Sequence, residues 1–175
     1  TCMLAAPQAD RYKELSDELE KVEPWLGTTN EERRLALVRR VDILNSMLTV
    51  APNYQSRMKC GQRLAEALSS AILNGAKPEG LSRLRRLSQD FEKAQDFDVL
   101  AYLEYARIHV EHSLAFEEQE FTPAEFDIKL SRVVAEYYDE KERFVERFPH
   151  CPKAPEFLLD LAAYDELTGF DEKAK

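Results

Sequence analysis

The sequence predicts an all-α fold of stacked antiparallel helical hairpins. Apolar residues recur at steps of three and four along nearly the whole chain of 175 residues, and no long stretch alternates as a half-buried strand would. The composition agrees, because 33% of the residues are charged and only 5 are glycine. Proline or glycine separates the periodic stretches, and such short connections favour antiparallel packing of neighbouring helices. We therefore expect one helical domain over residues 1–175.

Two helices are predicted before Pro52. The first covers about residues 9–23 and ends at Pro24 and Gly27. The second begins at Thr29, where Glu32 three residues later completes a capping box. Their inner faces follow from the apolar spacing: Tyr12, Leu15, Leu19 and Val22 in the first helix, and Leu37, Val41, Leu44 and Leu48 in the second.

A third helix is predicted over about residues 53–73. Asn74 and Gly75 are expected to stop it, because both residues tolerate a left-handed backbone. A fourth helix begins near Pro78 and ends before Asp96. The predicted inner faces are Met58, Gly61, Leu64, Ala65, Leu68 and Ile72 in the third helix, and Leu81, Leu84, Leu87 and Phe91 in the fourth.

Three further helices are predicted after Asp98. The fifth leads into an exposed acidic loop over residues 117–121, and the sixth covers about residues 123–147 behind a capping box formed by Thr122 and Glu125. The seventh covers about residues 154–167, and residues 171–175 resemble the first turn of an eighth helix, so we expect the array to be truncated there. The inner faces are Leu100, Leu103, Ala106, Val110 and Leu114 in the fifth helix, and Phe126, Leu130, Val133, Tyr137, Phe144 and Phe148 in the sixth.

The clearest repeat covers residues 148–175. It reads Phe148-Pro149-His150-Cys151-Pro152-Lys153-Ala154-Pro155-Glu156-Phe157-Leu158-Leu159-Asp160-Leu161-Ala162-Ala163-Tyr164, then Leu167-Thr168-Gly169-Phe170-Asp171-Glu172-Lys173-Ala174. This pattern resembles a tetratricopeptide repeat of the bacterial envelope type, as in outer-membrane assembly lipoproteins and periplasmic cell-division coordinators. It departs from the family pattern at Asp165, where the first helix of a repeat usually has tyrosine.

The resemblance implies a right-handed tetratricopeptide-like array that binds a protein or peptide in the periplasm or cell envelope. It also implies that Leu158, Leu161 and the small Ala162 lie in the contact between paired helices. Gly169 would then make the turn, and Ala174 would lie where the next helix crosses.

Charge and cysteine content narrow the function classes. The net charge of −9 disfavours nucleic acid and anionic lipid as partners, and no apolar run reaches the roughly 18–20 residues that a bilayer requires. Cys2, Cys60 and Cys151 have neither zinc-ligand nor CxxC spacing. Neighbouring Lys59 would favour a thiolate at Cys60 if the thiol were exposed, but we interpret Cys60 as a small residue at a helix contact.

One cluster could suggest metal chemistry. His109 and His112 share a helical face, and Glu104 or Glu117 could add a carboxylate. The His-Glu-x-x-His and paired Glu-x-x-His patterns are absent, so we interpret the cluster as a helix face and predict neither metal nor cofactor. The basic groups are interpreted as solvated surface paired with acidic residues: Arg33-Arg34, Arg39-Arg40 and Arg83-Arg85-Arg86.

These observations predict a non-catalytic protein-interaction or scaffold domain. Fold analogy selects Tyr102, Tyr105 and His109 as partner-binding residues, because a groove-lining helix of a hairpin would carry them. One alternative is an accessory helical domain of a larger exported enzyme, such as a thioredoxin-like thiol–disulfide protein, which CxxC beyond residue 175 would indicate. Another is a helical-bundle enzyme, which requires polar groups that converge inside the bundle.

Overall fold

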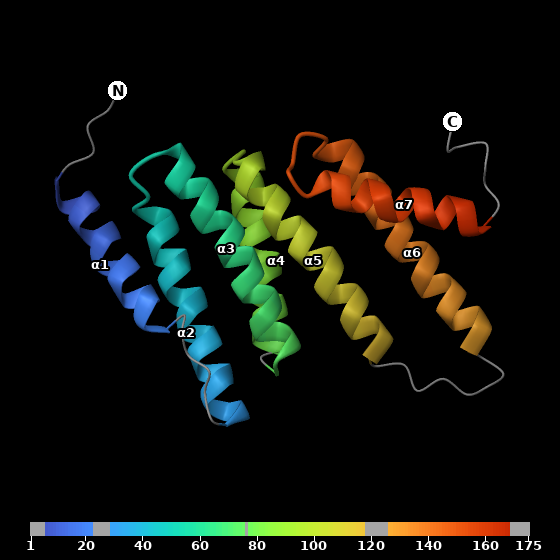
Figure 1. The fold of residues 1–175 in the computed structure, drawn as a ribbon, viewed down its shortest axis with the longest axis horizontal. Helices are drawn as coiled ribbons and strands as arrows, with labels where there is room; N and C mark the ends of the chain where they lie inside the picture. The colour runs from blue at the N-terminus through green and yellow to red at the C-terminus, as the bar shows by residue number, and fades with distance from the viewer. Residues whose placement is uncertain (1–5, 23–28, 76, 118–125, 169–175) are drawn as a thin grey trace. The chain divides into compact units, whose positions relative to one another are not determined.

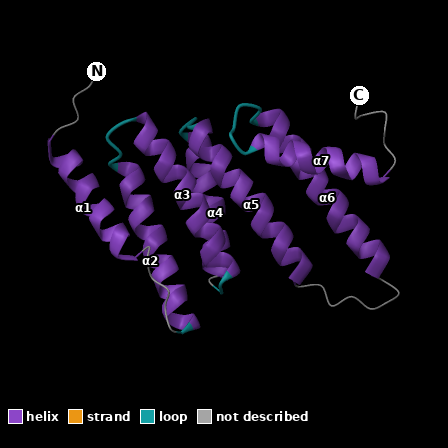
Figure 2. Ribbon diagram, viewed as in Figure 1, coloured by secondary structure: helices purple, strands orange, loops and turns teal. Residues whose placement is uncertain are grey.

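The computed structural model describes residues 6–22, 29–75, 77–117 and 126–168. Over these residues the chain forms seven α-helices and no strand, which confirms the all-α class (Figures 1 and 2). The helices are α1 (Ala6–Val22), α2 (Asn30–Thr49), α3 (Tyr54–Leu73), α4 (Lys77–Lys93), α5 (Phe97–Glu117), α6 (Phe126–Arg147) and α7 (Ala154–Thr168). Among the helices described, none is long and apolar enough to cross a membrane.

The chain divides into two compact units. The first unit is Thr1–Arg107 and the second is Ile108–Lys175, so the boundary falls inside α5. The prediction of a single domain over residues 1–175 stays a prediction, and each unit is described by itself below.

Local capping fixes where the helices of the first unit begin and end. The Thr29 Oγ1 accepts a hydrogen bond from the Glu32 backbone N–H at 3.2 Å, and the Glu32 carboxylate accepts one from the Thr29 N–H at 3.1 Å. This capping box confirms the predicted start of α2. Asn53 caps α3 through a single bond, in which its Oδ1 accepts from the Ser56 backbone N–H at 2.8 Å. After α3 only Gly75 uses the left-handed backbone, with φ of +106°, whereas Asn74 has φ of −101°.

The core of the first unit lies between consecutive helices: α1 packs on α2, α2 on α3, and α3 on α4, as Figure 1 shows. Most of the predicted inner residues of these helices are buried, and the others are half-buried: Tyr12, Val22, Leu37, Met58, Leu81, Leu87 and Phe91. Ile43 and Met47 are buried in addition to the predicted stripe of α2. They are covered because α2 is contacted by two helices, so its buried face is wider than one stripe.

Two contacts bring the first half of α5 against α3. A Cβ on Gly61 would lie 3.0 Å from the Val99 Cγ1, so the glycine permits the close approach of these helices. The Arg57 guanidinium donates to the Asp96 Oδ2 at 2.7 and 2.9 Å and to the Leu48 carbonyl at 3.1 Å. The other Asp96 oxygen accepts from the Val99 N–H at 3.3 Å, which caps α5. All five predicted inner positions of α5, from Leu100 to Leu114, are buried.

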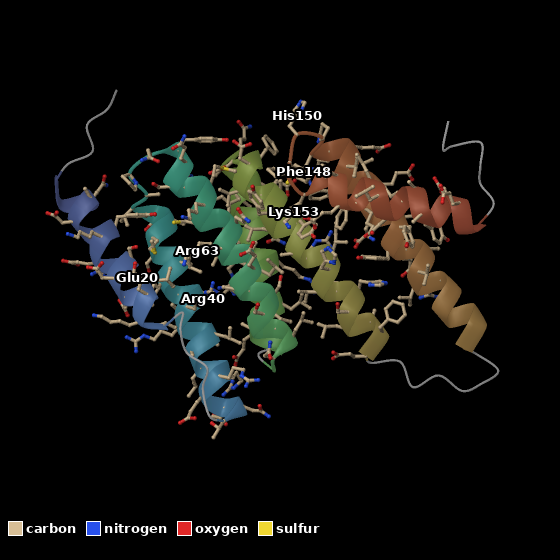
Figure 3. All side chains as sticks on the ribbon, viewed as in Figure 1. Glu20, Arg40, Arg63, Phe148, His150 and Lys153 are labelled. Atoms are coloured by element: carbon tan, nitrogen blue, oxygen red, sulfur yellow. The ribbon has the colours of Figure 1, made fainter. Side chains whose placement is uncertain are left out.

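In the second unit α6 packs against α7. The turn between them contains Phe148, His150 and Lys153, which Figure 3 labels. The predicted end of α6 near Pro149 and the predicted start of α7 at Ala154 are confirmed.

The face of α7 that packs against α6 is not the one that the resemblance assigns to the pairing with the next helix. Leu158 is 50% exposed and Ala162 is also exposed, so neither packs against α6. The helix expected to pair with them follows Thr168, outside the described residues, so their assignment to that contact stays a prediction. Ala154 and Phe157 are buried instead, and Leu161 is half-buried. The reason is that Phe157 packs edge-on against Phe144 of α6, with ring centroids 5.0 Å apart, which turns that face of α7 inward.

Other predictions fall outside the described residues. These are the stops at Pro24 and Gly27, the capping box at Thr122, and the turn and eighth helix after Thr168. Glu117 was predicted to open an acidic loop, but it is the last residue of α5.

Candidate functional site

The second unit holds a charged side chain in its core. Lys141 of α6 is 2% exposed, and its Nζ lies 2.6 Å from the Asp160 Oδ2 of α7. Tyr137, Lys141, Phe144 and Phe148 follow one another at steps of four, three and four, so Lys141 lies in the inner stripe of the chain segment. The ion pair therefore joins α6 to α7 from inside.

Aromatic rings surround the same ammonium group. The Lys141 Nζ lies 4.0 Å from the ring centroid of Tyr137, 4.8 Å from that of Tyr138 and 5.3 Å from that of Phe157. The faces of such rings attract a cation, and the attraction grows when water is excluded. The rings and Asp160, here called the Lys141 cage, together compensate for taking the ammonium out of water.

The second half of α5 adds two histidines beside this cage. His112 stacks on Tyr137, with centroids 3.5 Å apart and planes 12° apart, and meets Phe116 edge-on at 4.5 Å. The His109 ring lies 5.3 Å from that of Phe157, and its Nδ1 is 3.3 Å from the Tyr137 hydroxyl. The two histidines do share one helical face, as their spacing predicts, and that face packs on aromatic rings.

Burial keeps these titratable groups neutral. It lowers the pKa of His109 and lowers the pKa of His112 to about 4, and the positive charge of Lys141 acts in the same direction. Burial likewise raises the pKa of Tyr137 to about 12. Near pH 7 the two imidazoles and the phenol of the cluster are therefore neutral.

The described residues bring no metal-ligand set to this cluster. Within them, no group of three or more His, Cys, Asp or Glu side chains could hold a metal ion. Glu104, proposed as an additional ligand beside His109, instead pairs with Arg107 at 3.0 Å.

The three residues predicted to bind a partner are buried or half-buried within the protein. Tyr102 is 8% exposed, Tyr105 is half-buried and His109 is half-buried beside Phe157. Tyr102 and Tyr105 belong to the first unit and His109 to the second, so the structure does not place them in one described surface. Their role in binding stays a prediction.

A hollow of about 360 Å³ opens between the second half of α5 and α6. Four carboxylates and one guanidinium line it, together with the stacked His112 and Tyr137. The lining residues are Glu111, His112, Ala115, Glu136, Tyr137, Asp139, Glu140 and Arg143.

The outer face of α7 is apolar and open to solvent. Leu158 is half exposed and Leu159 is 73% exposed, and Ala162 and Ala163 are exposed beside them. These four residues are here called the α7 strip. The helix carries four acidic residues and no lysine or arginine; the acidic residues are Glu156, Asp160, Asp165 and Glu166.

Several arginines of the first unit form the surface pairs that were predicted. Arg39 pairs with Glu18 at 3.0 Å, and Arg83 pairs with Asp42 at 2.6 Å.

Cys60 is 2% exposed, its Sγ lies 3.5 Å from the Tyr12 hydroxyl, and burial raises the pKa of its thiol. Its packing role is thereby favoured over a reactive one.

Sequence reasoning missed the Lys141 cage. The predicted stripe of α6 passes from Tyr137 to Phe144 and skips a turn, and Lys141 occupies that turn.

No family model, curated protein or solved structure matches this chain.

Proposed function

We propose that the chain is a non-catalytic protein-interaction or scaffold domain built of tetratricopeptide-like helical hairpins. The α7 strip is the observation that carries this proposal. An apolar helix face is normally buried, whereas α7 carries apolar residues on two faces and, within the described residues, packs only one of them against α6. Contiguous apolar surface on an ordered helix is typical of a contact site.

The exposed leucines set a scale for what a partner would gain. Full burial of one leucine side chain is worth about 1.5–3 kcal/mol. Leu158 and Leu159 retain half and about three quarters of their exposure, so covering both would contribute on the order of 2–3 kcal/mol. Such a contribution is useful to an interface and costly to leave in water.

The packing of the first unit supports a hairpin array. Consecutive helices pack against each other. In addition, Gly61 lies close to Val99, so α3 also approaches α5, the next helix but one. A stack of hairpins requires both kinds of contact.

The cluster beside α5 supports a structural rather than a catalytic role. The Lys141 ammonium pairs with Asp160, and His112 stacks on Tyr137 and meets Phe116 edge-on. These contacts hold helices together, although His112 and Tyr137 also line the hollow between α5 and α6. The interaction role is supported by two observations: the charged Lys141 is paired inside the unit, and the apolar Leu158 and Leu159 are exposed.

Site-specific photo-crosslinking in cells that express the protein would test the proposal. A photoreactive phenylalanine is placed at Leu159, Leu35 or Tyr54, which are exposed apolar positions, and at Glu66 as an exposed polar control. We expect a discrete protein adduct from at least one apolar position and none from Glu66. Adduct-free chain at all three apolar positions would contradict an interaction role.

A further inference from the structure

The α7 strip has the shape of a helix-docking face. Leu158 and Ala162 are four residues apart, as are Leu159 and Ala163, so the strip consists of two adjacent rows along one side of the helix. The leucines supply ridges and the alanines leave grooves, which is the surface against which another helix packs closely.

The charges around the strip discriminate between occupants. Glu156 and Glu166 are exposed, and the Asp160 side chain is 51% exposed although it pairs with Lys141. Lys153, just before the helix, pairs with Glu156 at 2.6 Å and offsets one charge at that end. A net acidic border remains along the helix. Two copies of this chain that met through α7 would bring these acidic borders together, and that repulsion disfavours a symmetric dimer.

We propose that the α7 strip docks an amphipathic helix whose apolar stripe is flanked by lysine or arginine. This inference rests on the proposed interaction function and names its surface and its partner chemistry. The apolar stripe of the partner covers the two leucines, and its basic flanks meet Glu156, Asp160 and Glu166. Apolar burial supplies affinity, and the charges fix orientation and speed encounter.

A synthetic helical peptide tests the inference directly. The probe is a fluorescent peptide of about 18 residues in which leucines form one helical stripe and lysines flank it, a length that sustains a helix on binding. Its anisotropy is measured against the full chain. Two further peptides and one further condition serve as controls: the same stripe flanked by glutamate, a scrambled leucine–lysine peptide, and the original lysine peptide at raised salt.

Leu159→Ser removes the most exposed leucine of the strip, and Leu35→Ser is the matched control because Leu35 is 55% exposed on α2. We expect saturable binding of the lysine peptide that Leu159→Ser weakens about tenfold or more and Leu35→Ser leaves unchanged. The glutamate peptide and the scrambled peptide should bind at least tenfold more weakly, and salt should weaken the complex. Both serines lie on exposed helix faces, and circular dichroism of each variant verifies folding.

Three results overturn the inference. The first is equal binding by wild type and Leu159→Ser, and the second is equal binding by the scrambled peptide, which would mean that net charge alone attracts it. The third is a dimer in sedimentation that Leu159→Ser dissociates, because a second copy then covers the strip. If crosslinking succeeds from Leu35 or Tyr54 while the peptide fails, the interaction function stands and only the α7 assignment falls.

Discussion

Removal of the carboxylate of Asp160 should destabilise the second unit, whereas removal of the ammonium of Lys141 should not. The Lys141 ammonium, 2% exposed in the native chain, loses the oxygen at 2.6 Å in Asp160→Ala and keeps only the rings of the cage as partners. A charge-assisted hydrogen bond is worth about 1.5–3 kcal/mol, and water can partly replace a carboxylate that is half exposed. We therefore expect a loss of about 1–2 kcal/mol.

Lys141→Met reverses the balance. Methionine keeps the apolar stem against Tyr137 and Phe157 and removes the buried charge together with its desolvation cost. Asp160 is then left half in water, where a carboxylate has no need of a partner. The free energy of unfolding should change by less than about 1 kcal/mol in either direction.

Hydrogen exchange of peptides from α6 and α7 measures these changes locally. A loss of about 1–2 kcal/mol corresponds to about five- to thirtyfold faster exchange of amides that open with the unit. In the double variant Asp160→Ala with Lys141→Met, the penalty of the first substitution should disappear. The reasoning is refuted if Asp160→Ala costs as much in the methionine background as in the wild type, or if Lys141→Met is the more damaging single change.

Three other expectations follow from the described packing. The pKa of His112 in the folded state is about 4, below its ordinary 6.5, so the free energy of unfolding should fall by about 1–2 kcal/mol as the pH drops from 6.5 to 4. Urea denaturation of His112→Phe over the same pH range should show a loss smaller by that amount. An equal loss in His112→Phe and the wild type would contradict the expectation. Gly80→Ala should destabilise the first unit by about 1–2 kcal/mol despite its gain in helix propensity, because the new Cβ would lie 2.5 Å from the Ile72 Cγ1, which thermal melts can verify. Iodoacetamide followed by mass spectrometry should label half-buried Cys151 well before Cys60, and equal rates in native buffer would argue against burial of the latter.

Features encoded within a few residues could be predicted from the sequence. The capping box of Thr29 and Glu32 depends only on residue types three positions apart, and it forms as expected. The buried stripes of α3 and α5 follow equally from three- and four-residue spacing. Both kinds of signal are local, so no knowledge of the neighbouring helices is needed.

The direction in which α7 faces could not be predicted in this way. Ala154, Phe157 and Leu161 make one apolar face and Leu158, Leu159 and Ala162 another, so the apolar pattern does not distinguish inside from outside. The choice of the face that packs on α6 depends on tertiary contacts with the aromatic residues of α6. The buried face of such a helix is decided by the helix it packs against and not by its own apolar pattern.

Lys141 illustrates the opposite difficulty. Lysine is almost never fully buried without a partner, so its place in an apolar stripe is easily passed over. The informative sign is the unbroken spacing from Tyr137 through Lys141 to Phe144, combined with an acidic residue on the next helix. The partner Asp160 is 19 residues away and becomes visible only when α6 and α7 meet.

The Arg57–Asp96 pair has a consequence for how the first unit opens. One carboxylate holds the first turn of α5, and the guanidinium it binds also holds the carbonyl of Leu48 near the end of α2. The ends of three helices that are distant along the chain thus share one set of hydrogen bonds, and fraying of one end breaks bonds that hold the other two. The ends of α2, α3 and α5 should consequently melt as one cooperative patch, even though each is a terminus that would otherwise unravel alone.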